Sequence, residues 1–200
     1  MVTGVSSAIC ADEFICPHIS AVKVCLVQKL KKNLRCNLLQ RYKRYIMVQR
    51  YVVQVGDPIL RKVCKEVKNF DGELAKLLDD MKTTVRAEDG AGLAAPQVGV
   101  DARAVVVDVE EGFFELVNPV IYYSKGEQTG PEGCLSVKGK QGIVTRPDKV
   151  KVEYRDRNGR KHKLTAEGFF ARAVCHELDH LDGILYIDKA SNIVDLSEDK

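Results

Sequence analysis

The chain has 200 residues, of which 45% are hydrophobic and 30% are charged, and its formal net charge is +3. This composition is that of a folded globular protein and excludes a chain that is disordered throughout. A membrane-spanning helix is not expected either, because no uninterrupted apolar stretch approaches the roughly 20 residues that such a helix needs.

Charge and cysteine are unevenly distributed along the chain. Residues 1–46 contain eight basic and two acidic residues, whereas residues 47–200 carry a net charge of −3. An acidic body argues against a direct nucleic-acid site. The cysteine number is odd, the spacing suggests no disulfide framework and there is no plausible secretory signal, which together favour the reducing cytoplasm. We therefore divide the chain into a basic extension, residues 1–46, and a body, residues 47–200.

The extension contains an apolar residue at every fourth position: Leu26, Leu30, Leu34, Leu38, Tyr42 and Ile46. On a helix this spacing would form one apolar stripe. One interpretation is a membrane-surface or organelle-targeting helix. The interpretation that we favour is that the extension is disordered, or that it precedes the true start of translation at Met47.

The body begins with a short β-like run, residues 51–55, and a turn at Gly56-Asp57-Pro58. Asp71 is a suitable N-cap for a longer helix. The buried face of that helix would consist of Leu74, Leu77, Leu78, Met81 and Val85. The pattern stops at Gly90, where a loop rich in glycine and alanine begins, residues 90–99.

Strands are predicted in the middle of the body, at residues 103–109, 113–123, 149–154 and 160–165. Asn118-Pro119 would interrupt the second of them, and Asn158-Gly159 is a strong hairpin signal between the last two. A helix is predicted over residues 168–181. Its core contacts are expected from Phe169, Phe170, Ala173 and Val174. Strands in the middle and helices near both ends favour an α+β fold over regular βαβ alternation.

The strongest chemical signal is His176-Glu177-Leu178-Asp179-His180. Helix residues four positions apart lie one turn apart on nearly the same face, so both imidazoles can reach one metal ion. Glu177 lies on an adjoining edge, where it can contact a water on the metal without being a ligand. This is the pattern of metal-dependent hydrolases. A catalytic metal site usually has three protein ligands, so the two histidines leave one ligand to be found elsewhere in the chain.

Cys134 is a candidate for the missing ligand, because the glycine-rich approach in Thr129-Gly130-Pro131 could bring the backbone close to a metal. Cys175 adjoins His176 but lies about 100° around the helix. We interpret Cys175 as a packed core thiol, and Cys64 likewise.

A third segment of interest is residues 90–99, in which small residues permit close approach to a ligand or a neighbouring strand. Gln97 is its only polar side chain between Gly90 and Gly99. The segment lacks the pattern of a phosphate-binding loop.

Together, Gly90–Gln97, Glu132–Ser136 and His176–Gly183 resemble the three motifs of peptide deformylases, in the same order. The resemblance extends over residues 48–190 and makes residues 47–200 the catalytic domain. It implies an α+β fold in which antiparallel sheets pack around a central metal-binding helix.

The resemblance also implies a role for each motif residue. Cys134, His176 and His180 would be the metal ligands, and Glu177 the general base and acid. Gln97 and the backbone N–H of Leu135 would stabilise the oxyanion. The implied metal is ferrous iron, with zinc, nickel or cobalt as alternatives.

The implied reaction removes the formyl group from formyl-methionine at the N-terminus of newly synthesised polypeptides and releases formate. Three glycines would shape a small acyl site: Gly90, Gly92 and Gly133. Phe169 and Ala173 would contribute to a pocket for the methionine side chain, and Glu132 would be a partner of a ligand histidine. The implied partners are formyl-methionyl nascent peptides, with transient ribosome association, in the cytoplasm.

Two alternatives belong to other functional classes. A metallopeptidase that cleaves internal peptide bonds would lack its usual third ligand downstream of His180 and would leave the cysteine motif unexplained. A non-enzymatic metal-bearing or ribosome-associated module would be expected to have lost catalytic residues, but Gln97, Cys134 and Glu177 are all present.

Overall fold

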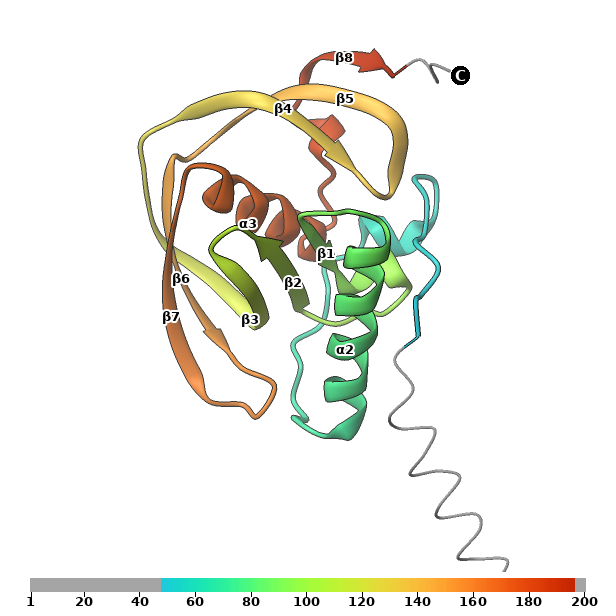
Figure 1. Cartoon of the computed structure of the whole chain (residues 1–200), viewed down its shortest axis with the longest axis vertical. Coiled ribbons are helices and arrows are strands. Elements are labelled where there is room, and N and C mark those ends of the chain that lie inside the picture. Colours follow the sequence, from blue (N-terminus) through green and yellow to red (C-terminus); the bar gives the residue numbers. More distant parts are fainter. Residues whose placement is uncertain (1–47, 197–200) are drawn as a thin grey trace, which may run out of the picture. The chain divides into compact units, whose positions relative to one another are not determined.

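The computed structural model describes residues 48–196, so the predictions made for the basic extension lie outside the described residues. Within this range the chain forms two α-helices and eight β-strands, and the paired strands are antiparallel (Figure 1). No helix in this range is long and apolar enough to cross a membrane. The predicted α+β class is confirmed.

The larger sheet contains five strands in the order β1-β2-β3-β6-β7. Their bounds are Gly92–Ala94 for β1, Ala104–Val109 for β2, Gly112–Lys125 for β3, Lys149–Arg155 for β6 and Lys161–Glu167 for β7. The strands predicted at residues 103–109, 149–154 and 160–165 are confirmed. The predicted hairpin turn joins β6 to β7, and Gly159 adopts there a φ of +82°, which glycine tolerates without strain.

The predicted interruption at Asn118-Pro119 is found as a break in the pairing with β6, although the strand does not end there. β3 continues through both residues, with a shift of register against β6 between Val117 and Val120. Such a bulge accommodates Pro119, which has no N–H to donate to the ladder. The Asn118 side chain bonds the N–H and the C=O of Val67 at 2.8 and 2.9 Å. The bulge therefore distorts the strand without ending it.

A second sheet, which the sequence did not predict, contains β4 (Gln128–Cys134), β5 (Val137–Arg146) and β8 (Ser191–Asp195) in the order β4-β5-β8. β4 has two glycines and a proline among its seven residues, and these residue types are depleted in strands. Pro131 is tolerated because β4 lies at an edge of the sheet.

The β-like run at residues 51–55 joins neither sheet, so its prediction as a strand is wrong. Instead, the N–H groups of Val53 and Val55 donate to the carbonyls of Gln97 and Ser136, both at 2.8 Å. The segment therefore connects the short 3-10 helix Ala95–Val98 with the turn between β4 and β5, both of which come later in the chain.

Helix α2 (Gly72–Ala87) begins as predicted, because the Asp71 carboxylate accepts hydrogen bonds from the N–H groups of Glu73 and Leu74 at 3.0 and 3.2 Å. Its apolar face is buried as expected: Leu74, Leu77, Leu78, Met81 and Val85. Helix α3 (Gly168–Leu181) matches the predicted range. Its predicted core residues are buried except for Phe169, which is 63% exposed.

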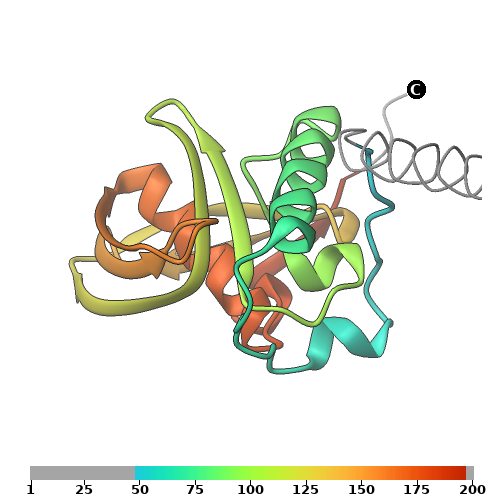
Figure 2. The ribbon, with the colours of Figure 1, turned by 90° about the horizontal axis from the view of Figure 1, so that it is seen from below.

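Strand β2 shows how the two helices are arranged. Val105 and Val107 pack into one core with residues of α3, whereas Ala104 and Val106 pack into another core with residues of α2. Alternate residues of a strand face opposite sides, so the two helices cover opposite faces of the larger sheet (Figure 2). Helix α3 also contacts β5 of the second sheet. It is therefore the central helix that the expected fold requires.

Candidate metal centre and active site

The three predicted metal ligands meet beside α3. His176 and His180 lie one turn apart on this buried helix, and Cys134 ends strand β4. One candidate ligand atom from each residue lies within 4.8 Å of the other two, and Cys134 Sγ is 3.3 Å from His180 Nε2. Two imidazoles and a thiol so arranged can bind one metal ion and leave a fourth position open for water or substrate.

The surroundings of these residues fit a cation. Gln97 Nε2 and the N–H of Ser136 both point at Cys134 Sγ at 3.4 Å, and such donors suit a sulfur in its anionic, metal-binding form. Burial alone would lower the pKa of His176, but its contacts with Cys134 and Glu132 raise it to about 10. The His176 ring is therefore surrounded by groups that favour positive charge.

Two buried polar atoms at this centre have no partner among the described residues: Oε2 of Glu177 and Nδ1 of His180. Burial raises the pKa of Glu177 to about 7 and lowers the pKa of His180. Buried polar groups are normally hydrogen-bonded. The unpartnered Glu177 carboxylate is therefore placed to exchange a proton with a bound molecule.

Glycine at position 92 makes room for Glu177. A Cβ atom at Gly92 would lie only 2.5 Å from Glu177 Oε1. Gly90 is also crowded, since a Cβ there would lie 3.0 Å from Leu135 Cδ1. At Gly133 the nearest atom would be 3.7 Å away, an ordinary contact. Among these three positions, glycine is therefore most strictly required at position 92, where any side chain would collide with Glu177.

Gln97 lies in a segment that is more regular than the predicted loop at residues 90–99, because β1 is followed there by the short 3-10 helix Ala95–Val98. The Gln97 side chain is 1% exposed. Its Oε1 accepts a hydrogen bond from the N–H of Ala94 at 2.8 Å, and its Nε2 donates to Ser136 Oγ at 3.2 Å. The amide is thus fixed at its oxygen and presents its donors to the centre.

Leu135 lies in the turn between β4 and β5. Its C=O accepts a hydrogen bond from Gln54 Nε2 at 3.1 Å, and among residues 48–196 we find no acceptor for its N–H. Sequence reasoning missed Gln54, because no local pattern connects two residues 81 positions apart.

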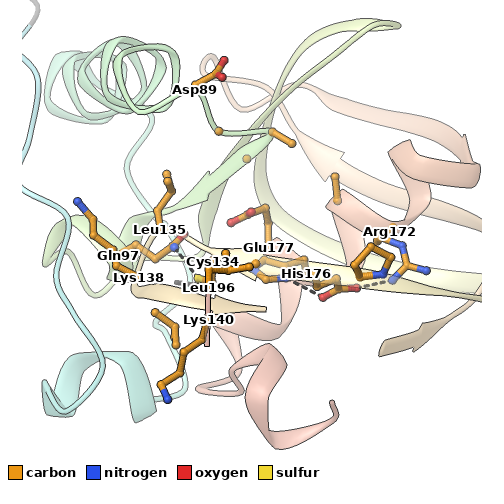
Figure 3. Close-up of a pocket in the computed structure, with 18 of the residues that line it drawn as sticks. Asp89, Gln97, Cys134, Leu135, Lys138, Lys140, Arg172, His176, Glu177 and Leu196 are labelled. Atoms are coloured by element: carbon orange, nitrogen blue, oxygen red, sulfur yellow. Dashed lines mark hydrogen bonds and ion pairs between the residues drawn. The ribbon is translucent and has the colours of Figure 1, made fainter. Parts of the chain in front are cut away.

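A cavity of about 370 Å³ joins these groups (Figure 3). The predicted site residues that line it are Gly90, Gly92, Gln97, Gly133, Cys134, Leu135, Phe169, Ala173, His176 and Glu177. His180 does not line the cavity and is 1% exposed. The structure therefore brings the predicted site residues together, and Phe169 lies at the cavity rather than in the core.

Residues 49–195 match the family model described as polypeptide deformylase. The chain belongs to the peptide deformylase family. The peptide deformylase of Caldanaerobacter subterraneus subsp. tengcongensis is 50% identical over 152 residues, which cover 76% of this chain and 96% of that protein. The peptide deformylase of Caldicellulosiruptor bescii is 53% identical over 152 residues, or 76% and 92% of the two chains.

Solved structures agree with this assignment. The crystal structure of a peptide deformylase from Legionella pneumophila has a TM-score of 0.70 and 40% identity, and the match covers 72% of this chain and 88% of that chain. The deformylase from Thermotoga maritima has a TM-score of 0.70 and 39% identity, with 72% and 98% covered.

Peptide deformylases are metal-dependent hydrolases that remove the N-terminal formyl group from newly made polypeptides. As a member of the family, the chain is a hydrolase of this kind. A group that could bind the metal is present in the structure and consists of Cys134, His176 and His180.

The predicted contact between Glu132 and a candidate ligand histidine is present in the structure, because Glu132 Oε2 lies 2.9 Å from His176 Nδ1. The sequence did not predict Arg146 and Arg172, which also bond this buried carboxylate at 2.9 Å. Burial alone would raise the pKa of Glu132, but hydrogen bonds from His176 and Arg146 hold it at about 2. A buried carboxylate requires such partners. No spacing rule identifies them, because the two arginines come from β5 and α3.

Proposed function

We propose that Cys134, His176 and His180 hold the metal ion of this deformylase and that Glu177 is its general base and acid. One observation carries the proposal: the three candidate ligand atoms lie within 4.8 Å of one another, and Cys134 and His176 line the same cavity as Glu177, whose Oε2 atom has no partner among the described residues. When bound, a divalent cation at such a centre polarises a carbonyl oxygen and makes a water molecule easier to deprotonate.

Glu177 transfers the proton. Its Oε2 atom takes the proton from the attacking water and delivers it to the methionine nitrogen as the bond to the formyl carbon breaks. The products are then formate and a free amino terminus. Gly92 contributes by leaving space for this carboxylate at the wall of the cavity.

Gln97 and Leu135 stabilise the negative charge that develops on the formyl oxygen. Nε2 of Gln97 and the N–H of Leu135 are donors at the cavity. Each is fixed by a second hydrogen bond, from Ala94 to the Gln97 oxygen and from Gln54 to the Leu135 carbonyl. Donors held in place beforehand need little reorganisation in the transition state.

The walls of the cavity suit a small acyl group at the end of a peptide. Gly90, Gly92 and Gly133 surround the formyl site, and Phe169 and Ala173 contribute to the methionine pocket. β1 and β4 are edge strands of the two sheets, and both supply residues to the cavity. An extended substrate can therefore bind with its backbone along these edges.

Ferrous iron is proposed as the native metal, with zinc, nickel and cobalt as alternatives, because of the resemblance to the family. A thiolate and two imidazoles do not by themselves distinguish iron from zinc. We expect anaerobically purified protein to contain about one iron per chain, and exposure to air to reduce its activity by oxidation. Fully active anaerobic protein that contains only zinc would contradict the iron assignment.

We also propose that the enzyme acts in the cytoplasm during transient association with the ribosome. The support is chemical, because the substrate is the N-terminus of a chain under synthesis. Cosedimentation with ribosomes that carry formylated nascent chains tests the association. Complete absence from the ribosomal pellet at low salt would contradict it.

Formate release from formyl-methionyl peptides by metal-loaded protein tests the proposed function directly. Glu177→Gln should retain the metal but lower kcat by about 100-fold or more, because the amide cannot accept the proton. Glu110→Gln changes an exposed glutamate in the turn between β2 and β3 and should have no effect. Unchanged turnover in Glu177→Gln would remove this residue from the base role.

An inhibitor provides a second test. The deformylases of Synechococcus elongatus and Ehrlichia chaffeensis have crystal structures in complex with actinonin. We expect actinonin to inhibit this chain and to raise its Tm when the metal is present. The absence of both effects in an active preparation would argue against a shared binding cavity.

A further inference from the structure

The C-terminal strand β8 leads to a residue of the catalytic cavity that no motif predicted. Leu196 follows β8 and lines the same cavity as Cys134, His176 and Glu177. In the view of Figure 3 it lies beside Lys140, across the pocket from Asp89. Leu196 is 52% exposed and belongs to none of the three apolar cores found among residues 48–196. Its side chain is therefore available to a bound molecule.

Pairing between β8 and β5 fixes the position of Leu196. Asp195 lies opposite Lys140 in this antiparallel ladder, and their side chains form an ion pair at 2.7 Å. The N–H of Leu196 donates to the carbonyl of Gly139 at 2.7 Å. Leu196 is thus attached to the β4–β5 hairpin, which also carries Cys134.

Two apolar residues within β8 show that the position of Leu196, just after the strand, is particular. Ile193 and Val194 are 44% and 52% exposed, but neither lines the cavity. Exposed apolar surface on a cavity wall gains free energy when a ligand covers it, whereas the same surface elsewhere does not. This difference makes Val194 a matched control for Leu196.

The arrangement of the cavity indicates which part of a substrate reaches Leu196. The formyl group must lie at Cys134, His176 and Glu177, and the methionine side chain is assigned to residues of α3. The rest of the peptide must leave along an exposed part of the cavity wall, and Lys140 and Leu196 form one such part. We propose that Leu196 forms an apolar subsite for the side chains that follow formyl-methionine. This inference rests on the proposed function and adds a preference for apolar residues at those positions.

The test compares two peptide amides, formyl-Met-Leu-Leu and formyl-Met-Ser-Ser, with the full-length metal-loaded protein. The readout is the ratio of their kcat/KM values. Leu196→Ser should lower this ratio by roughly tenfold, mainly through the KM of the leucine peptide, because the lost apolar contact is replaced by a polar group. Val194→Ser should leave the ratio unchanged.

The outcomes separate this inference from the function on which it rests. An unchanged ratio in Leu196→Ser would overturn the subsite while formate release continues. An equal fall in Val194→Ser would also overturn it, because the effect would then belong to β8 as a whole. If no variant and no wild-type protein released formate from either peptide, the proposed function would be wrong, and the subsite with it.

Discussion

Nδ1 of His176 lies 2.9 Å from Oε2 of Glu132, so a buried carboxylate orients the ring of a proposed metal ligand. Arg146 and Arg172 donate to the same carboxylate at 2.9 Å. Arg146 also bonds Asp179 at 2.5 Å. Since Glu132 is held by three side chains, it has little freedom to rotate. The direction of His176 Nε2 is therefore set by this network of buried side chains.

Glu132→Gln should weaken metal binding. Glutamine has the same size but only one acceptor oxygen, and its other terminal group is an NH2 donor. This NH2 group would face the N–H donors of His176 or of the arginines, so at least one of their hydrogen bonds would be lost. Loss of such an outer partner typically lowers metal affinity by about 10- to 100-fold. Competition with a coloured chelator for zinc or cobalt measures the change directly.

The matched control is Glu153→Gln, which removes an exposed ion pair with Lys163 on the larger sheet. Exposed pairs of this kind contribute little, so this variant should bind metal as the wild type does. Equal metal affinity in the wild type and in Glu132→Gln would show that the His176 ring is held without the carboxylate.

Gly92→Ala should impair catalysis more than Gly133→Ala, although both glycines line the cavity. The added Cβ would come within 2.5 Å of Glu177 Oε1 at position 92, but only within 3.7 Å of the nearest atom at position 133. Displacing a catalytic group by about 1 Å can cost about 100-fold in rate. Steady-state kinetics of both variants, with metal content as the check on folding, decide the point. A larger loss in Gly133→Ala would contradict the proposed position of Glu177.

Local patterns predicted the elements whose signals lie within a few residues. Asp71 capped α2, and the spacing of His176 and His180 correctly placed both imidazoles on one face of α3. The motif at Glu132–Ser136 brought Cys134 to the same centre. These features depend on helix periodicity and on short chain segments, which a sequence displays directly.

Features that depend on distant pairing were not predictable in this way. The second sheet was missed because β4 is rich in glycine and proline, and because β8 is exposed throughout and has no buried face to give a pattern. Arg146, Gln54 and Leu196 reach the site only through the pairing of strands and the packing of loops. Phe169 was assigned to the core as well as to the substrate pocket, and the fold exposes it at the cavity.

Asp80 of α2 should make the free energy of unfolding of the domain depend on pH under acidic conditions. Burial alone would raise the pKa of this carboxyl, but hydrogen bonds from Lys76, the N–H of Val48 and Arg50 hold it below its usual value. Because the pKa is lower in the folded chain than in the unfolded chain, the ionised carboxylate stabilises the fold at any pH above its unfolded pKa of about 3.9. This stabilisation is lost as the pH falls from the unfolded pKa through the folded pKa.

Asp80→Asn should accordingly lower the free energy of unfolding by roughly 2 kcal/mol at pH 7, because the partly buried cations lose their counter-charge. The difference from the wild type should shrink as the pH falls below about 4, because the unfolded chain then binds a proton that the folded Asp80 carboxyl, with its lowered pKa, does not yet bind. Urea unfolding at pH 7 and at pH 3 measures both values. A difference that is equally large at pH 3 would mean that the charge of Asp80 is not the cause.

The contacts of Asp80 also define a test of the proposal that residues 47–200 are the catalytic domain and that residues 1–46 are dispensable. A chain that begins at Met47 retains Val48 and Arg50, which bond Asp80, and the N–H of Arg50, which donates to Thr84 Oγ1 at 2.8 Å. We expect it to match the full chain in kcat/KM and in urea midpoint. A second variant provides the contrast. A chain that begins at Val52 lacks Val48 and Arg50 and therefore loses these hydrogen bonds. Asp80, which is 2% exposed, then keeps only Lys76 as a cationic partner. That chain should be less stable by about 2–3 kcal/mol, since a buried carboxylate loses most of its donors. Loss of activity or folding on removal of residues 1–46 alone would show that the extension belongs to the working enzyme.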